Sequence, residues 1–223
     1  MSSGADAGPI LVTTVTTDLW PLVHAERAAL ADDLAALSEQ QWQAGSLCTD
    51  WTVEETVAHL VAGASIGPWR WIRSVVGARG DVHRHNARRL AEHRGATPAE
   101  TLTRFRAVVD STVCPPGPKE MWLGEIVVHG ADVRRPLGRV RDVPVSTSTL
   151  LAAFFATQNS TVRSRTVSTG LRLTATDGPF NAGPDDGPLV SGPTLALVMA
   201  MAGRTTFCDD LTGPGVDVLR SRC

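Results

Sequence analysis

The stretch that decides the fold is GEIVVHGADVR, residues 124–134. On a helix Glu125 and His129, four residues apart, project from the same face about one turn from each other. A carboxylate oxygen and an imidazole nitrogen are both donors that zinc accepts. The pattern predicts a helix from about 119 to 135, which Pro136 and Gly138 end.

Three more helices are predicted before this one. Apolar residues recur at helical spacing over 17–37. A second helix opens at Thr52, where Glu55 completes a capping box, and it carries His59 beside its apolar stripe. A third opens at Thr97, again with a capping-box pattern and with proline at the first helical position. The polar, basic residues 80–96 are interpreted as a loop or a partly helical excursion. Four helices in up-and-down order are the simplest assembly.

The pattern changes after residue 138. Helices are predicted at 150–157, 193–202 and 216–220, and residues 171–175 alternate as a strand does. Short extended pieces separated by glycine and proline lie between them. The expected fold class is therefore α+β: a helical metal-binding bundle over 1–140, followed by a small α/β domain over 141–223.

Composition limits the function classes. The formal net charge of -2 gives no general attraction to nucleic acid or to anionic lipid, so neither is expected as a partner. The amino terminus lacks the pattern of a secretory signal, and the longest weakly polar stretch, 57–71, is too short and too polar to span a bilayer. We expect a cytoplasmic protein whose four cysteines are free thiols.

The candidate metal site combines His59 with Glu125 and His129. Bundle packing can bring the second and fourth helices face to face, and three protein ligands leave one coordination position open, as in catalytic zinc sites. Spacing alone also fits a solvated Glu–His pair and a satisfied core histidine. Asp132, nearly one turn further on, is either a partner that fixes a ligand imidazole or a solvated carboxylate.

Several stretches together resemble the mycothiol-dependent maleylpyruvate isomerase family. They are SLCTDWTV at 46–53 running into AHL at 58–60, the stretch 124–134 quoted above, and the segments 192–204 and 211–216. The resemblance covers most of the chain. It implies a DinB-like amino-terminal bundle and a sterol-carrier-like carboxy-terminal domain. It also implies zinc bound by the histidine of the Ala-His-Leu segment and by the Glu-x-x-x-His pair, which here are His59, Glu125 and His129.

The chain departs from the family pattern at two places. Thr49 and Asp50 stand where the family usually has Pro-Gly before the tryptophan, and Ala131 stands where it usually has a tryptophan. Neither position is a ligand, but both are expected to reshape the pocket. Trp51, Trp69, Trp71 and Trp122 are expected to fill the core, with one of them a candidate wall of the cleft.

The leading hypothesis is a zinc-dependent, mycothiol-using isomerase or S-transferase that acts on a small electrophile. A zinc ion with an open position keeps a thiol as the nucleophilic thiolate, and the resemblance implies that this thiol is mycothiol. The alternatives are a metal-dependent hydrolase and a non-catalytic small-molecule binding protein on the same fold. No side chain, Cys48 included, is assigned a catalytic role.

Three arginines are candidates for binding the cosubstrate or another anionic group. Arg204 follows the helix predicted at 193–202, so it either faces the cleft or sits as a cation near the carbonyl end of that helix. Arg84 and Arg88, with Arg89 beside them, either attract an anion or form a solvated surface.

Overall fold

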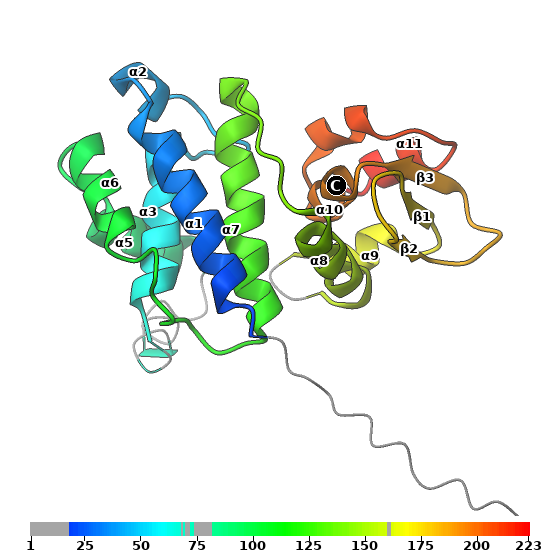
Figure 1. Cartoon of the computed structure of the whole chain (residues 1–223), viewed down its shortest axis with the longest axis horizontal. Helices are drawn as coiled ribbons and strands as arrows, with labels where there is room; N and C mark the ends of the chain where they lie inside the picture. Colours follow the sequence, from blue (N-terminus) through cyan, green and yellow to red (C-terminus); the bar gives the residue numbers. More distant parts are fainter. Residues whose placement is uncertain (1–17, 68, 70–71, 74–81, 160–161) are drawn as a thin grey trace, which may run out of the picture.

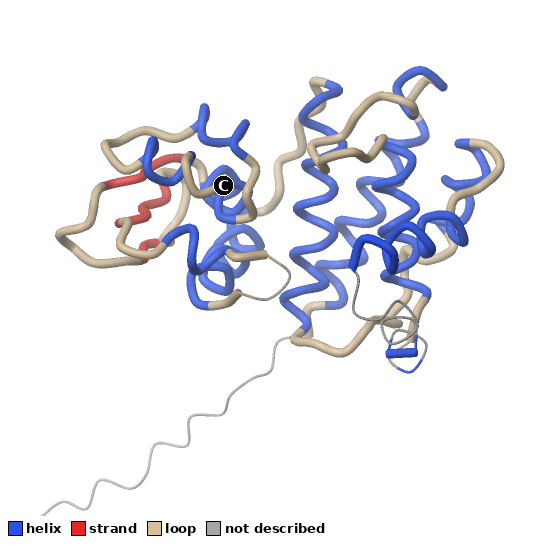
Figure 2. Tube along the Cα trace, turned by 180° about the vertical axis from the view of Figure 1, so that it is seen from behind, coloured by secondary structure: helices blue, strands red, loops and turns tan. Residues whose placement is uncertain are grey.

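The computed structural model describes residues 18–67, 69, 72–73, 82–159 and 162–223. Three long helices, α1 (Trp20–Ala35), α3 (Val53–Ser65) and α7 (Lys119–Arg134), lie alongside one another in the amino-terminal half (Figure 1). The short strands lie at the far end of the molecule from them (Figure 2). The predicted α+β class is confirmed.

The helical half contains the four predicted helices and more. α1 and α3 each pack against both α7 and α6 (Pro98–Arg106), and α7 continues into the 3₁₀ turn η1 (Arg135–Leu137). α5 (Val82–His93) packs against α3, so of the two interpretations of residues 80–96 the partly helical one is confirmed. The short α2 (Glu39–Trp42) was not predicted, although Ser38 begins it with a capping box.

The first turn of α3 fixes where His59 stands. The Thr52 hydroxyl accepts a hydrogen bond from the backbone N–H of Glu55, and the Glu55 carboxylate accepts one from the N–H of Thr52. The predicted capping box is therefore present, and it satisfies two amides that a helix start leaves open. At Thr97 only half of the box forms, because Glu100 accepts from the N–H of Ala96 instead.

The carboxy-terminal half is a small sheet covered by helices. Its elements are α8 (Val145–Thr157), α9 (Ser164–Ser168), β1 (Arg172–Ala175), β2 (Asn181–Ala182), β3 (Leu189–Gly192), α10 (Thr194–Met201), η2 (Thr205–Asp210) and α11 (Val216–Arg220). The strand order is β2-β1-β3, with β1 antiparallel to β2 and parallel to β3. The strand and helices predicted here are confirmed, with ends that differ by a few residues.

The two halves meet where α8 packs against α7. A Cβ atom on Gly124 would lie 3.3 Å from the ring of Phe155, so a larger residue would separate the two helices. α10 is buried on nearly all of its surface, as expected of a core helix that is apolar all round. The segment 138–144 links the halves, and the domain boundary at 140/141 stays a prediction. Within the described part of the chain, no helix combines the length and apolarity needed to cross a bilayer.

A tight loop leads into α3 and touches α7. The N–H of Ser46 donates to the carbonyl of Trp51 at 2.9 Å, and the N–H of Leu47 donates to the carbonyl of Asp132 at 3.0 Å. Asp50, at the tip, has φ 68°, and it is the one non-glycine residue with positive φ in the described residues. Aspartate tolerates this left-handed conformation better than most residues, so the loop keeps its shape without a glycine at its tip.

We predict that Asp50→Gly stabilises the protein. Glycine reaches positive φ without a Cβ clash, so the free energy of unfolding should rise by up to about 1 kcal/mol, whereas Asp50→Val should lower it by about 1–2 kcal/mol. The measurement is urea denaturation followed by circular dichroism. The control is Asp185→Gly, at an exposed aspartate whose φ is not positive, which should give no gain. A gain at both positions would contradict the assignment to backbone strain.

Candidate metal centre

Three donor atoms from two helices converge on one point. Nε2 of His59, on α3, lies 3.3 Å from Oε2 of Glu125, and Nε2 of His129 lies 3.2 Å from the same oxygen. The ligand atoms of these three side chains all lie within 4.8 Å of one another. The structure thus brings together the three residues that the sequence singled out, in an arrangement that one cation can share.

Packing on either side of each donor explains this convergence. Ala58 and Leu60 flank His59 and are buried, and Ile126 and Val128 are buried close to Glu125 and His129. The three donor side chains themselves keep between 12% and 24% of their surface exposed. They therefore sit at the edge of the core, where an ion or a substrate can reach them.

Asp132 anchors the imidazole of His129 from behind. Its side chain is fully buried, and its Oδ2 lies 2.9 Å from Nδ1 of His129. Because an ionised carboxylate only accepts hydrogen bonds, Nδ1 of His129 carries a hydrogen toward Asp132, and Nε2 is the ring nitrogen that faces Glu125. The structure excludes the interpretation of Asp132 as a solvated carboxylate and supports the interpretation as the partner that fixes a ligand imidazole.

Arg204 supplies the counter-charge for Asp132. Its Nε lies 2.9 Å from Oδ1 and its Nη2 lies 2.7 Å from Oδ2, a two-pronged pair of the kind that guanidinium and carboxylate form well. Nη1 of Arg204 donates to the carbonyl of Ala202 at 2.6 Å, at the end of α10. Arg204 therefore lies as a cation at the carbonyl end of that helix, which was one of its two predicted positions. That Arg204 also binds an anionic ligand stays a prediction.

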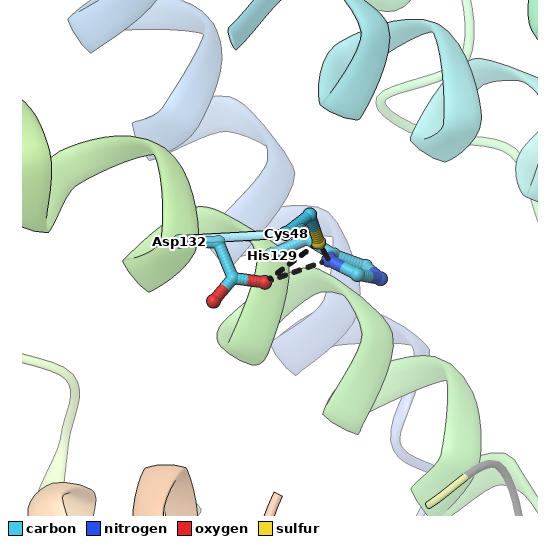
Figure 3. A group of neighbouring side chains, drawn as sticks. All are labelled: Cys48, His129 and Asp132. Carbon is cyan, nitrogen blue, oxygen red and sulfur yellow. Dashed lines mark hydrogen bonds and ion pairs between the residues drawn. The ribbon is translucent and has the colours of Figure 1, made fainter. Parts of the chain in front are cut away.

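Cys48 belongs to the same cluster, although sequence analysis gave it no role. Its Sγ lies 3.3 Å from Nδ1 of His129 and 3.2 Å from Oδ2 of Asp132 (Figure 3). The same sulfur lies 3.6 Å from Nη2 of Arg204. The hydrogen bond from Leu47 to the carbonyl of Asp132 brings it there. No sequence spacing relates residue 48 to residue 132, so only the folded loop reveals the contact.

Cys48, His129 and Asp132 form a second group with metal-ligand types. However, both oxygens of Asp132 already accept hydrogen bonds from Arg204. A cation there would have to displace a buried guanidinium, whereas the hydrogen-bond partners of the Glu125 carboxylate among the described residues are two imidazoles. The group of His59, Glu125 and His129 therefore fits a metal better.

Trp51 forms one wall of the centre. Its ring centroid lies 5.0 Å from that of His59 and 6.4 Å from that of His129. The other tryptophans were expected to fill the core. For Trp69 that expectation was wrong, because this residue lies beyond the end of α3 and is 81% exposed. Trp122 is half-buried, and Trp71 lies outside the described residues.

Hydrogen bonds set the charges of the cluster against the effect of burial. Burial raises the pKa of Glu125, but the hydrogen bonds from His129 and His59 outweigh it and hold that pKa well below its ordinary value. Burial likewise opposes ionisation of Asp132, yet His129 and Arg204 lower its pKa to about 2. Burial lowers the pKa of His129, while its bonds to Asp132, Cys48 and Glu125 raise it well above its usual range. The carboxylates of Glu125 and Asp132 are thus both anionic at neutral pH. In this arrangement they favour the protonated form of the His129 imidazole that lies between them.

Arg84 and Arg88 lie on α5, which packs against the helix that carries His59. Arg88 is exposed, and the side chain of Arg84 lies outside what the structure describes. Neither is among the residues whose contacts define the metal centre. Their predicted role in binding an anionic cosubstrate stays a prediction.

Comparison with known proteins adds a family and a fold. A family model described as the mycothiol maleylpyruvate isomerase N-terminal domain matches residues 23–134, which is half of the chain. No curated protein matches the chain. The match ends at the last residue of α7, so it includes all three donor residues of the metal centre.

Two solved structures share the fold over most of the chain. One is the crystal structure of the mycothiol-dependent maleylpyruvate isomerase, with 18% sequence identity and a TM-score of 0.60. The other is a crystal structure of a mutant of that enzyme, with 18% identity and a TM-score of 0.58. Each match covers 87% of this chain and 91% of the other. By the match over 23–134, the chain belongs to the family defined by the mycothiol maleylpyruvate isomerase N-terminal domain.

Proposed function

We propose that this protein is a zinc-dependent, mycothiol-using isomerase or S-transferase that acts on a small electrophile. The observation that carries the proposal is the convergence of His59, Glu125 and His129 on one point, with Nδ1 of His129 already bonded to Asp132. Membership of the family supports the choice of mycothiol as the thiol.

The residues present fit a divalent metal. Two imidazole nitrogens and one carboxylate oxygen are donors of the types and number found in catalytic zinc sites, which keep a position open. When bound there, zinc supplies the positive charge that keeps a thiol deprotonated at neutral pH. Asp132 holds Nδ1 of His129, so Nε2 is the nitrogen that would bind the metal, and the ring of Trp51 lies beside the centre.

The proposed reaction uses the thiol as a nucleophile toward an activated double bond. The sulfur forms a C–S bond, the electron pair of the double bond moves to the activating group, and the former double bond becomes free to rotate. Expulsion of the thiolate restores the double bond in the other geometry, so the thiol is not consumed. If a proton is delivered to the carbon instead, the C–S bond stays and the outcome is a thiol transfer.

Charged groups around the centre suit an anionic partner. Arg204, with 15% of its side chain exposed, pairs with the carboxylate behind His129, and we propose that it also contacts an anionic group of the thiol or the electrophile. Arg84 and Arg88 on α5 are proposed to attract the same partners at longer range. We likewise propose residues 1–140 as the metal-binding domain and 141–223 as a separate α/β domain.

We expect that the purified protein holds about one zinc per chain and that His59→Ala loses this zinc. The measurement pairs elemental analysis with an assay of mycothiol and small α,β-unsaturated carbonyl compounds, in which both isomerisation and loss of free thiol are recorded. The control is His24→Ala, at a histidine on α1 outside the centre, which should keep both metal and activity.

Other outcomes of this assay would end the proposal. Full thiol-dependent activity in His59→Ala would contradict a role for the metal. Turnover that needs the metal but no thiol would support the hydrolase alternative. Tight binding of the electrophile without turnover, unchanged by chelation, would support a non-catalytic binding protein.

A further prediction concerns the hydrogen bond between Asp132 and the imidazole of His129. Asp132→Asn removes the charge that fixes the imidazole, so zinc affinity should fall by about 10–100-fold. Asp210→Asn is the matched control, because Asp210 also pairs with an arginine, Arg135, but lies outside the centre. The measurement is competition for zinc with a chromogenic chelator, with melting temperatures recorded in parallel. Equal zinc affinities in Asp132→Asn and the parent protein would show that Asp132 does not support the metal ligand.

A further inference from the structure

A cavity separate from the metal centre lies between the two halves of the chain. Its volume is about 410 Å³, and its lining includes Val127 and Ala131 of α7, Val140 of the linking segment, Ala196 of α10 and Phe207 of η2. This size falls within the range of small-molecule sites, which is roughly 300–1,000 Å³. The comparisons with known proteins say nothing of this cavity.

The cavity and the metal centre lie on opposite sides of α7. Val127, Ala131 and Arg134 each follow a residue of the metal centre, namely 125, 129 and 132, by two positions. Two residues correspond to a rotation of about 200° around an α-helix. The cavity therefore faces away from the donors and is a separate site.

The wall of the cavity carries more positive than negative charge. Four arginines line it, and the carboxylates bonded to them are Asp33, Glu26 and Asp210. Asp33 pairs with two of the arginines. Its carboxylate lies 2.6 Å from Nε of Arg134 but 3.9 Å from Nη1 of Arg139, so the second ion pair is the looser one. In these pairs four guanidinium groups share three carboxylates, and Asp142 adds a further negative charge near Arg141.

One of these arginines also carries a buried N–H group that lacks an acceptor in the described residues. Nη2 of Arg134 is buried and has no hydrogen-bond partner in the described part of the chain. An unpaired buried donor costs about 1–3 kcal/mol, which an acceptor brought by a ligand would recover. Arg139, which is partly exposed, adds a second cation at the same wall.

The remaining lining is apolar. Phe207, whose ring lies under the guanidinium of Arg135, contributes apolar surface together with Val127 and Ala131. Val140 is 88% exposed, which is unusual for a large apolar side chain. Ala131 is also one of the two departures from the family pattern, which usually has a tryptophan there. A small residue at this position leaves the space that the cavity occupies.

We propose that this cavity binds a small monocarboxylate with a compact apolar body, independently of the metal centre. The apolar body lies against Phe207, Val127 and Ala131, and the carboxylate is held by the guanidinium groups of Arg134 and Arg139. A carboxylate suits the planar N–H groups of arginine and the buried Nη2 of Arg134, which has no acceptor among the described residues.

The experiment is calorimetric titration of the full chain with 1-naphthoate and with the uncharged 1-naphthalenemethanol. Saturable binding of naphthoate is expected, with the alcohol at least about tenfold weaker because it lacks the charge-assisted hydrogen bonds. Arg139→Gln should weaken naphthoate binding by about tenfold and leave the alcohol unchanged. Arg172→Gln, at an exposed arginine on β1 that does not line the cavity, is the matched control.

Two further variants separate this site from the metal centre. Ala131→Trp should fill the cavity and abolish binding of both compounds, with its fold checked by melting temperature; if it does not fold, Arg139→Gln still decides. His59→Ala, which removes a metal ligand, should bind naphthoate as the parent does, whether or not the protein is a zinc enzyme. Absence of saturable binding, equal affinity for acid and alcohol, an unchanged affinity in Arg139→Gln, or loss of binding in His59→Ala would overturn the proposal.

Discussion

The buried carboxylate of Asp132 is the interaction on which the centre depends. It accepts from the imidazole of His129, from the guanidinium of Arg204 and from the thiol of Cys48, within 3.2 Å in each case. A buried charge is costly unless paired and hydrogen-bonded, and Asp132 meets both conditions only because three separate segments reach it. The orientation of His129, and with it the position of Nε2, is a consequence of that arrangement.

α7 is the structural element that the two sites share. One face carries the ligands and their anchor, and the opposite face borders the cavity beneath the linking segment. Gly124 allows α8 to pack closely against the same helix. A single helix of 16 residues therefore positions the metal ligands, joins the carboxy-terminal half and forms one wall of the cavity.

Local sequence patterns predicted the parts of the structure that depend on local physics. Thr52 and Glu55 fixed the start of α3 because a capping box involves only neighbouring residues. The spacing of Glu125 and His129 placed both donors on one face for the same reason. For residues 80–96 the sequence left a loop and a partly helical excursion open because the composition is polar and basic, and the helix α5 that forms there packs on α3.

The parts that could not be predicted depend on contacts between distant residues. That His59 meets Glu125 follows from how α3 packs against α7, and the family resemblance suggested it more strongly than spacing did. Arg204 and Asp132 are 72 residues apart, and Cys48 and Asp132 are 84 apart, so no periodicity or motif relates them. The shape of the loop around Asp50 brings the thiol to the centre, and one sequence does not reveal such a shape.

The pairing of Arg204 with Asp132 also affects how the protein is made. A ribosome releases the chain from its amino terminus, so all three metal donors emerge well before residue 204 does. Until that arginine is synthesised, the carboxylate that supports His129 lacks its guanidinium partner, so its burial is less favourable. The complete inner wall of the metal centre can therefore form only after the chain has been extended to residue 204.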